Sequence, residues 1–232
     1  VQLSNFIIHK CWENASKIFN LFSHECSRNG LTNRRRGGMI RKTGRGPRSR
    51  AAGEGFRLDG GRDDKNITCC FTGHRPEKLP WGTREDAPEC LSLKARIAQT
   101  LEQLYAKGYR HFISGMAKGA DTYFAEAVLD LRRRHPDVRL EAAVPCPTQA
   151  DRWRAADRAR YRALLEQCDL ETLVQQHYDR FCMHRRNRYM VERSSALVAV
   201  YDGMGGGTLY TISYAMDCGL DVILLEPSPA AM

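Results

Sequence analysis

The sequence lacks an uninterrupted apolar run of the roughly 20 residues that a membrane-spanning helix needs. It also lacks a charged segment followed by a short apolar core, the pattern of a secretory signal. Its nine cysteines are scattered, with no Cys-x-x-Cys pair. We therefore expect no membrane partner, no disulfide framework and no metal site, and the cysteine pattern favours reduced thiols in the cytoplasm.

Several motifs of known chemistry are absent as well. Neither the G-x-G-x-x-G dinucleotide fingerprint nor the nucleotide P-loop occurs, and no Ser–His–Asp order stands out. Acidic residues are few near the glycine-rich segments described below, although hydrolysis normally needs a positioned acid or base. The sequence thus favours a binding protein over an enzyme. We expect the protein to need no cofactor.

Charge is unevenly distributed along the 232 residues. Of the net charge of +9, residues 1–65 carry +8 and the remainder carries +1. Residues 33–65 are rich in Gly and Arg and poor in apolar side chains, so they cannot order themselves by burial. We therefore divide the chain into a basic, disordered extension, 1–65, and a domain, 66–232.

The basic extension has two interpretations. A cluster of arginines can bind nucleic acid through its phosphates. Alternatively, the segment is a solvated leader, from a reading frame extended upstream of a start at Met39. No aromatic side chains interleave with the arginines to stack on bases, which favours the second interpretation.

Short apolar runs alternate with helical patterns from residue 67 onward. This alternation predicts a parallel sheet covered on both faces, in a Rossmann-like three-layer α/β/α sandwich. The expected strands cover residues 67–71, 111–113, 138–144, 171–174, 196–200 and 222–225. Ligands of such sheets bind beyond the carboxyl ends of the strands, so the loops that follow the strands should gather there.

The loop after the fifth expected strand carries the clearest signal. Asp202 is followed by Gly205, Gly206 and Gly207, and then by Thr208 as a plausible N-cap of a helix. A glycine turn at a helix N-terminus presents bare N–H groups to an anion, most often a phosphate. The alternative is a tight turn that binds nothing.

Two other loops supply small and charged residues. Gly73, His74 and Arg75 follow the first expected strand, and Arg75 could hold a phosphate or carboxylate through two N–H groups, or simply close the turn. The second strand leads into a segment whose small residues permit a ligand to approach the backbone closely. The same segment carries an aspartate that could bind a ribose hydroxyl or simply complement the helix dipole. These candidates are Ser114, Gly115, Gly119 and Asp121.

The remaining candidates lie near the third strand and on the helix before the fifth. Gln149 and Trp153 follow the third strand, and Trp153 either stacks on a base or anchors the core. Among three arginines of one helical segment, we expect Arg186 to face inward together with Asn187. The complete set of predicted ligand-binding residues is Gly73, His74, Arg75, Ser114, Gly115, Gly119, Asp121, Gln149, Trp153, Arg186, Asn187, Asp202, Gly205, Gly206, Gly207 and Thr208.

Five blocks in order resemble a known family. They are FTGHRP at 71–76, SGMAKGAD at 114–121, PCPTQADRW at 145–153, RNRYMVERS at 186–194 and YDGMGGGTLYTISYA at 201–215. Together they resemble the YpsA-like proteins of the SLOG superfamily, which are related to DprA and LOG proteins. The resemblance implies a six-stranded, mainly parallel sheet of order 3-2-1-4-5-6. It also implies a nucleotide or ADP-ribose-like ligand at the glycine turns.

One departure from the pattern bears on activity. The phosphoribohydrolase relatives carry PGGxGTxxE with a catalytic Glu, whereas here Thr211 takes that place and the Pro is missing. The leading prediction is therefore a module that binds or senses a nucleotide-type ligand. One alternative is a nucleotide N-glycosidic hydrolase with Glu192 as substitute carboxylate. Another is a DprA-like protein that binds single-stranded DNA, disfavoured by the domain's charge of +1. Self-association stays open.

Overall fold

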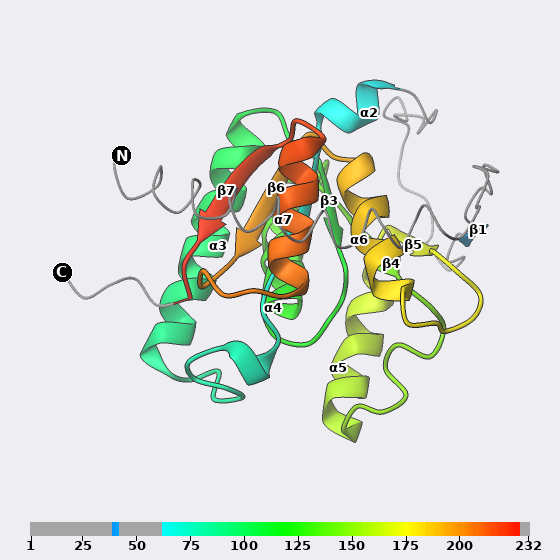
Figure 1. Ribbon diagram of the computed structural model, residues 1–232. Helices are drawn as coiled ribbons and strands as arrows, with labels where there is room; N and C mark the ends of the chain where they lie inside the picture. The colour runs from blue at the N-terminus through cyan, green and yellow to red at the C-terminus, as the bar shows by residue number, and fades with distance from the viewer. Residues whose placement is uncertain (1–38, 42–61, 228–232) are drawn as a thin grey trace, which may run out of the picture.

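The computed structural model describes residues 39–41 and 62–227 (Figure 1). The strands are Met39–Arg41 (β1), Thr68–Thr72 (β2), His111–Ser114 (β3), Arg139–Val144 (β4), Leu170–Leu173 (β5), Ala196–Val200 (β6) and Asp221–Leu225 (β7). The helices are Arg62–Asn66 (α2), Pro88–Ala106 (α3), Ala120–Arg134 (α4), Ala155–Leu165 (α5), Cys182–Glu192 (α6) and Gly207–Asp217 (α7), with a 3₁₀ turn at Pro76–Lys78 (η1).

The strands form one sheet of order β1-β5-β4-β3-β2-β6-β7, in which every neighbouring pair except β1 and β5 is parallel. This confirms the Rossmann-like α/β/α class. The order 3-2-1-4-5-6 is wrong in the place of one strand. The expected fourth strand, β5, lies beside β4, and β2 pairs directly with β6. The chain builds outward from β2 to β5 and then returns to the other side of β2, so the switch in strand order falls between β2 and β6.

Buried side chains alternate between the two faces of the sheet. In β6, Ala196, Val198 and Val200 pack into one core, and Leu197 and Ala199 pack into the other. The first core receives α3, α4 and α5, and the second receives α6 and α7. Figure 1 shows α6 and α7 in front of the sheet and α4 behind it. Because both faces are covered, β6 reads as a continuous apolar run.

Part of the predicted extension is ordered. Met39–Arg41 pairs antiparallel with β5, and Arg62–Asn66 forms a short helix that leads into β2. These two short elements depart from the expectation that residues 33–65 form no regular structure. The rest of that basic segment, and the proposed leader before Met39, lie outside the described residues. Within the described part, no helix is long and apolar enough to cross a membrane.

The burial of Phe124 on α4 predicts that its truncation destabilises the protein far more than truncation of an exposed phenylalanine. Phe124 is fully buried, and its ring stacks on Phe71 with a centroid separation of 4.4 Å. We expect Phe124→Ala to lower the free energy of unfolding by about 3–5 kcal/mol, because it leaves a cavity in the core. Phe181, which is 37% exposed, is the matched control, and Phe181→Ala should cost below about 1 kcal/mol. Urea denaturation measures both values, and equal losses would contradict the packing described.

Candidate anion-binding site

A buried histidine joins the loops that follow β2 and β6. The Nε2 atom of His74 lies 2.8 Å from Oδ1 of Asp202, and its Nδ1 atom lies 3.5 Å from the hydroxyl of Thr208. Partial burial alone would raise the pKa of Asp202, but the Met204 N–H and His74 lower it below the usual value. His74 therefore holds the two loops together at the switch point.

The glycine turn leads directly into α7. Its N-cap is Gly206, with φ 145°, a conformation that favours glycine, and no side chain caps the helix. Thr208 is the second helical residue and not the predicted N-cap. Its buried hydroxyl points to His74 instead of to the helix end. The first N–H groups of α7 thus have no intrahelical partner and face the carboxyl edge of the sheet.

A lysine that sequence reasoning missed reaches this turn. The Nζ atom of Lys78 donates to the carbonyl of Gly205 at 3.1 Å. A Cβ on Gly206 would lie 3.0 Å from the same ammonium, so a side chain there would crowd it. Lys78 ends η1, a turn begun by Pro76 that directs the chain toward α7. The sequence signal was the proline two residues earlier, which favours the start of a short helical turn.

The loop after β3 joins the same edge. The N–H of Ala120, at the start of α4, donates to the carbonyl of His74 at 3.1 Å. Gly119 precedes it and lies against that carbonyl, and Gly73 lies against the Ala120 side chain. Ser114 uses its buried hydroxyl within the loop, accepting from the Met116 N–H at 3.1 Å. The loop is therefore held rigidly beside His74, and the Ser114 hydroxyl acts in its support.

Arg186 faces inward, as predicted, whereas Arg185 and Arg188 are exposed. Its Nη1 donates to the carbonyl of Gly115, and its Nε donates to Oδ1 of Asn187 at 2.8 Å. Asn187 in turn donates to Thr211 at 2.8 Å, whose hydroxyl donates to the Gly207 carbonyl at 2.9 Å. This chain of hydrogen bonds connects the loop after β3 to the first turn of α7.

Charges of both signs lie close together beside this chain. Burial raises the pKa of Asp121 to about 6, although the neighbouring Arg186 and Arg75 act to lower it. Arg75 is exposed, and its guanidinium has no hydrogen bond or ion pair with any residue of the described range. Arg75 is therefore a cation at the site edge with its donors open to an anion.

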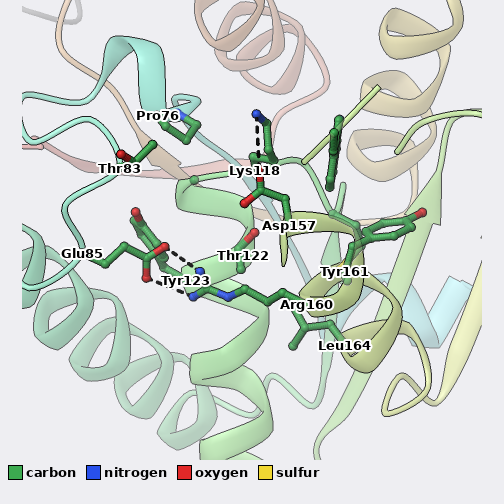
Figure 2. Close-up of a pocket in the computed structure, with 13 residues that line it drawn as sticks. Pro76, Thr83, Glu85, Lys118, Thr122, Tyr123, Asp157, Arg160, Tyr161 and Leu164 are labelled. Carbon is green, nitrogen blue, oxygen red and sulfur yellow. Dashed lines mark hydrogen bonds and ion pairs between the residues drawn. The ribbon is translucent and has the colours of Figure 1, made fainter. Parts of the chain in front are cut away.

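Gln149 and Trp153 contact different parts of these loops. Gln149 donates to the carbonyls of Gly115 and Met116 at 3.3 and 2.8 Å, and its Oε1 is buried without a partner among the described residues. Trp153 packs edge-on against Tyr161 with centroids 5.3 Å apart. It lines a cavity of about 100 Å³ between α4 and α5, and the lining of this cavity includes no residue of the glycine turn. Figure 2 shows this cavity with the residues that line it.

The substitute carboxylate of the hydrolase alternative is out of place. Glu192 ends α6, whereas Arg186 lies six residues earlier, about 9 Å along the helix axis. Its carboxylate accepts a hydrogen bond from Tyr214 at 2.8 Å, away from the glycine turn. Thr211, at the position that corresponds to the catalytic Glu of the phosphoribohydrolase relatives, is fully buried and hydrogen-bonded. No group of three potential metal ligands occurs in the described part of the chain.

The fold and this edge define a Rossmann-like α/β/α protein whose loops meet at the switch in strand order. A family model, YpsA, described as the YspA SLOG family, matches residues 69–217. The chain therefore belongs to the YpsA family of SLOG proteins.

Curated relatives match the same part of the chain. The chain is 31% identical to the uncharacterized SPbeta prophage-derived protein YoqJ of Bacillus subtilis, over 55% of this chain and 82% of the relative. It is 27% identical to a UPF0398 protein of Bacillus pumilus, over 56% and 71%.

Two DNA processing proteins A share the fold. That of Streptococcus pneumoniae aligns with a TM-score of 0.50 and 20% identity, over 72% of this chain and 52% of its own length. That of Helicobacter pylori, solved in a study of its single-stranded DNA binding mode, has a TM-score of 0.50 and 15% identity, over 73% and 68%. The chain thus spans about half of the S. pneumoniae protein.

The close approach of Arg186 to Gly115 predicts that a side chain at position 115 destabilises the protein. A Cβ on Gly115 would lie 1.7 Å from Nη1 of Arg186, so Gly115→Ala must displace a buried guanidinium. We expect a loss of stability of about 1–3 kcal/mol from this overpacking. Gly205 is the control, because nothing lies within 4 Å of a Cβ there. Thermal unfolding of both variants checks this, and an unchanged Gly115→Ala protein would contradict the contact.

The raised pKa of Asp121 predicts how the free energy of unfolding depends on pH. Because the folded protein holds this proton up to about pH 6, against an ordinary pKa of 3.8, the contribution of Asp121 to stability is complete below about pH 4. It is lost as pH rises through 6, by up to about 3 kcal/mol. Asp121→Asn should remove this loss. Unfolding free energies of both proteins between pH 4 and pH 7 measure it, and parallel curves would show that Asp121 titrates normally.

Proposed function

We propose that the chain binds a nucleotide or nucleotide-derived small molecule, with a phosphate at the N-terminus of α7. The observation that carries the proposal is the position of Lys78, whose ammonium contacts Gly205 and lies beside Gly206. A side-chain cation and bare helical N–H groups thereby face the same point. Both favour a multiply charged oxyanion.

The surrounding loops support a ligand larger than phosphate. Arg75 presents open donors at the same edge, and the buried Oε1 of Gln149 accepts from no described residue. Donors for an anion and acceptors for hydroxyl groups thus lie on adjacent loops. This is the combination that a ribose phosphate would use.

Binding without cleavage fits these residues best. The carboxyl groups at this edge are engaged or buried: Asp202 pairs with His74, and Asp121 is 5% exposed. Thr211 stands where the phosphoribohydrolase relatives carry their catalytic Glu, and its hydroxyl donates to a backbone carbonyl. We infer a binding or sensing role in the cytoplasm.

Removing single cations should weaken binding selectively. We expect Lys78→Ala and Arg75→Ala each to lower the affinity for AMP, GMP or ADP-ribose by about 10- to 100-fold, since each removes a charged hydrogen bond worth about 1.5–3 kcal/mol. Lys107→Ala, at the C-terminal end of α3, makes the same charge change at the opposite edge of the sheet and should bind like the parent. Calorimetry measures all three. No binding by the folded parent at millimolar ligand would refute the proposed function.

Single-stranded nucleic acid is the second candidate ligand. The fold shared with the H. pylori protein favours it, and the basic residues 1–65 could add phosphate contacts. This candidate requires binding to oligonucleotides that weakens steeply with salt and with removal of residues 1–65. Binding of mononucleotides that is insensitive to that truncation would favour the small-molecule ligand.

A further inference from the structure

The cavity between α4 and α5 is not used by the phosphate site. It opens beside the same loops, because Pro76 and Gly119 line it. Pro76 begins η1, and Lys78 ends this turn at the glycine loop of α7. The cavity and the proposed phosphate site therefore lie on either side of one short turn. A single ligand could reach both.

Two charged side chains of this cavity keep open hydrogen-bonding capacity. The Nζ atom of Lys118 lies 3.9 Å from Oδ2 of Asp157 and 3.8 Å from Glu77, beyond hydrogen-bonding distance in both cases. Figure 2 shows Lys118 and Asp157 directed toward each other across the cavity. The two groups thus form an ion pair but no hydrogen bond, so the ammonium keeps its N–H donors and the carboxylate its acceptors for a ligand.

The other strong cation of the cavity is already saturated. Arg160 binds Glu85 at 2.6 and 3.0 Å, and Glu126 at 2.7 and 2.8 Å, each through two hydrogen bonds. These ion pairs hold α5 against α4 and the loop before α3. Arg160 therefore supports the wall, and Lys118 and Asp157 are the charged groups left for a ligand.

An aromatic surface completes the cavity. The indole of Trp153 is half-buried, and Lys118 lies 5.9 Å from its ring centroid. That ammonium lies over the face of the indole, so a planar ring that stacks there must displace it to the edge of the ring, on the side where Lys118 pairs with Asp157. Stacking of a base on an aromatic side chain is worth about tenfold or more in affinity.

We propose that this cavity binds a purine base that carries a carbonyl oxygen beside N–H donors, as guanine does. The Lys118 ammonium donates to the carbonyl oxygen, and the Asp157 carboxylate accepts from the adjacent N–H groups while the ring stacks on Trp153. Adenine presents an amino group and a bare ring nitrogen at the same edge, and that nitrogen repels the carboxylate. This inference rests on the proposed nucleotide binding, to which it adds the identity of the base.

Calorimetry on the full chain with GMP, AMP and XMP tests it. We expect GMP to bind at least about tenfold more tightly than AMP, because the wrong base leaves polar groups unpaired. Asp157→Asn should lose this preference and gain affinity for XMP, since the new amide donates to the 2-carbonyl of xanthine. Asp130→Asn, the same change at an exposed position of α4 that does not line the cavity, is the matched control.

The outcomes separate this inference from the proposed function. Equal binding of GMP and AMP by the parent, or an Asp157→Asn variant with the parent's preference, would overturn the base assignment and leave nucleotide binding intact. Absence of binding for every nucleotide would overturn both. A gain of XMP affinity supports the assignment even if the variant is less stable.

Discussion

The switch in strand order between β2 and β6 is the constraint on which the site depends. The strands β3, β4 and β5 are added in turn on one side of β2, whereas β6 and β7 are added on its other side. The loops after β2 and β6 therefore lead in opposite directions from neighbouring strands and leave a crevice between them. His74 holds the two loops together through Asp202 and Thr208. The loops are thereby held without a ligand, and the N-terminus of α7 is fixed relative to Lys78.

The polar residues at this edge fall into two groups, which differ in burial and in hydrogen bonding. Arg186, Asn187 and Thr211 are buried or half-buried and hydrogen-bonded to each other or to backbone, so they position the loops. Lys78 and Arg75 are exposed cations that face solvent at the carboxyl edge. Desolvating the Arg186 guanidinium costs free energy that its hydrogen bonds partly offset. Its partners are the Gly115 carbonyl in the loop after β3 and Asn187 on its own helix.

Much of this was predictable from residue order, for identifiable reasons. The alternation of apolar runs with helical patterns predicts the α/β class, and the inward orientation of Arg186 follows from the apolar residues that come after it. The place of β5 was not predictable, because a short strand with one buried residue carries no information about its neighbour. The same holds for Lys78: its contact with Gly205 joins positions 127 residues apart. The separation of Trp153 from the glycine turn likewise depends on how α5 packs.

In the proposed function, Lys78 and the first turn of α7 hold a phosphate at the switch point. A crystal structure of the full chain with GMP tests it most directly. We expect phosphate oxygens within about 2.7–3.2 Å of the N–H groups of Gly207 and Thr208 and of the Lys78 ammonium. A nucleotide bound with its phosphate elsewhere, and those N–H groups open to solvent, would contradict the account.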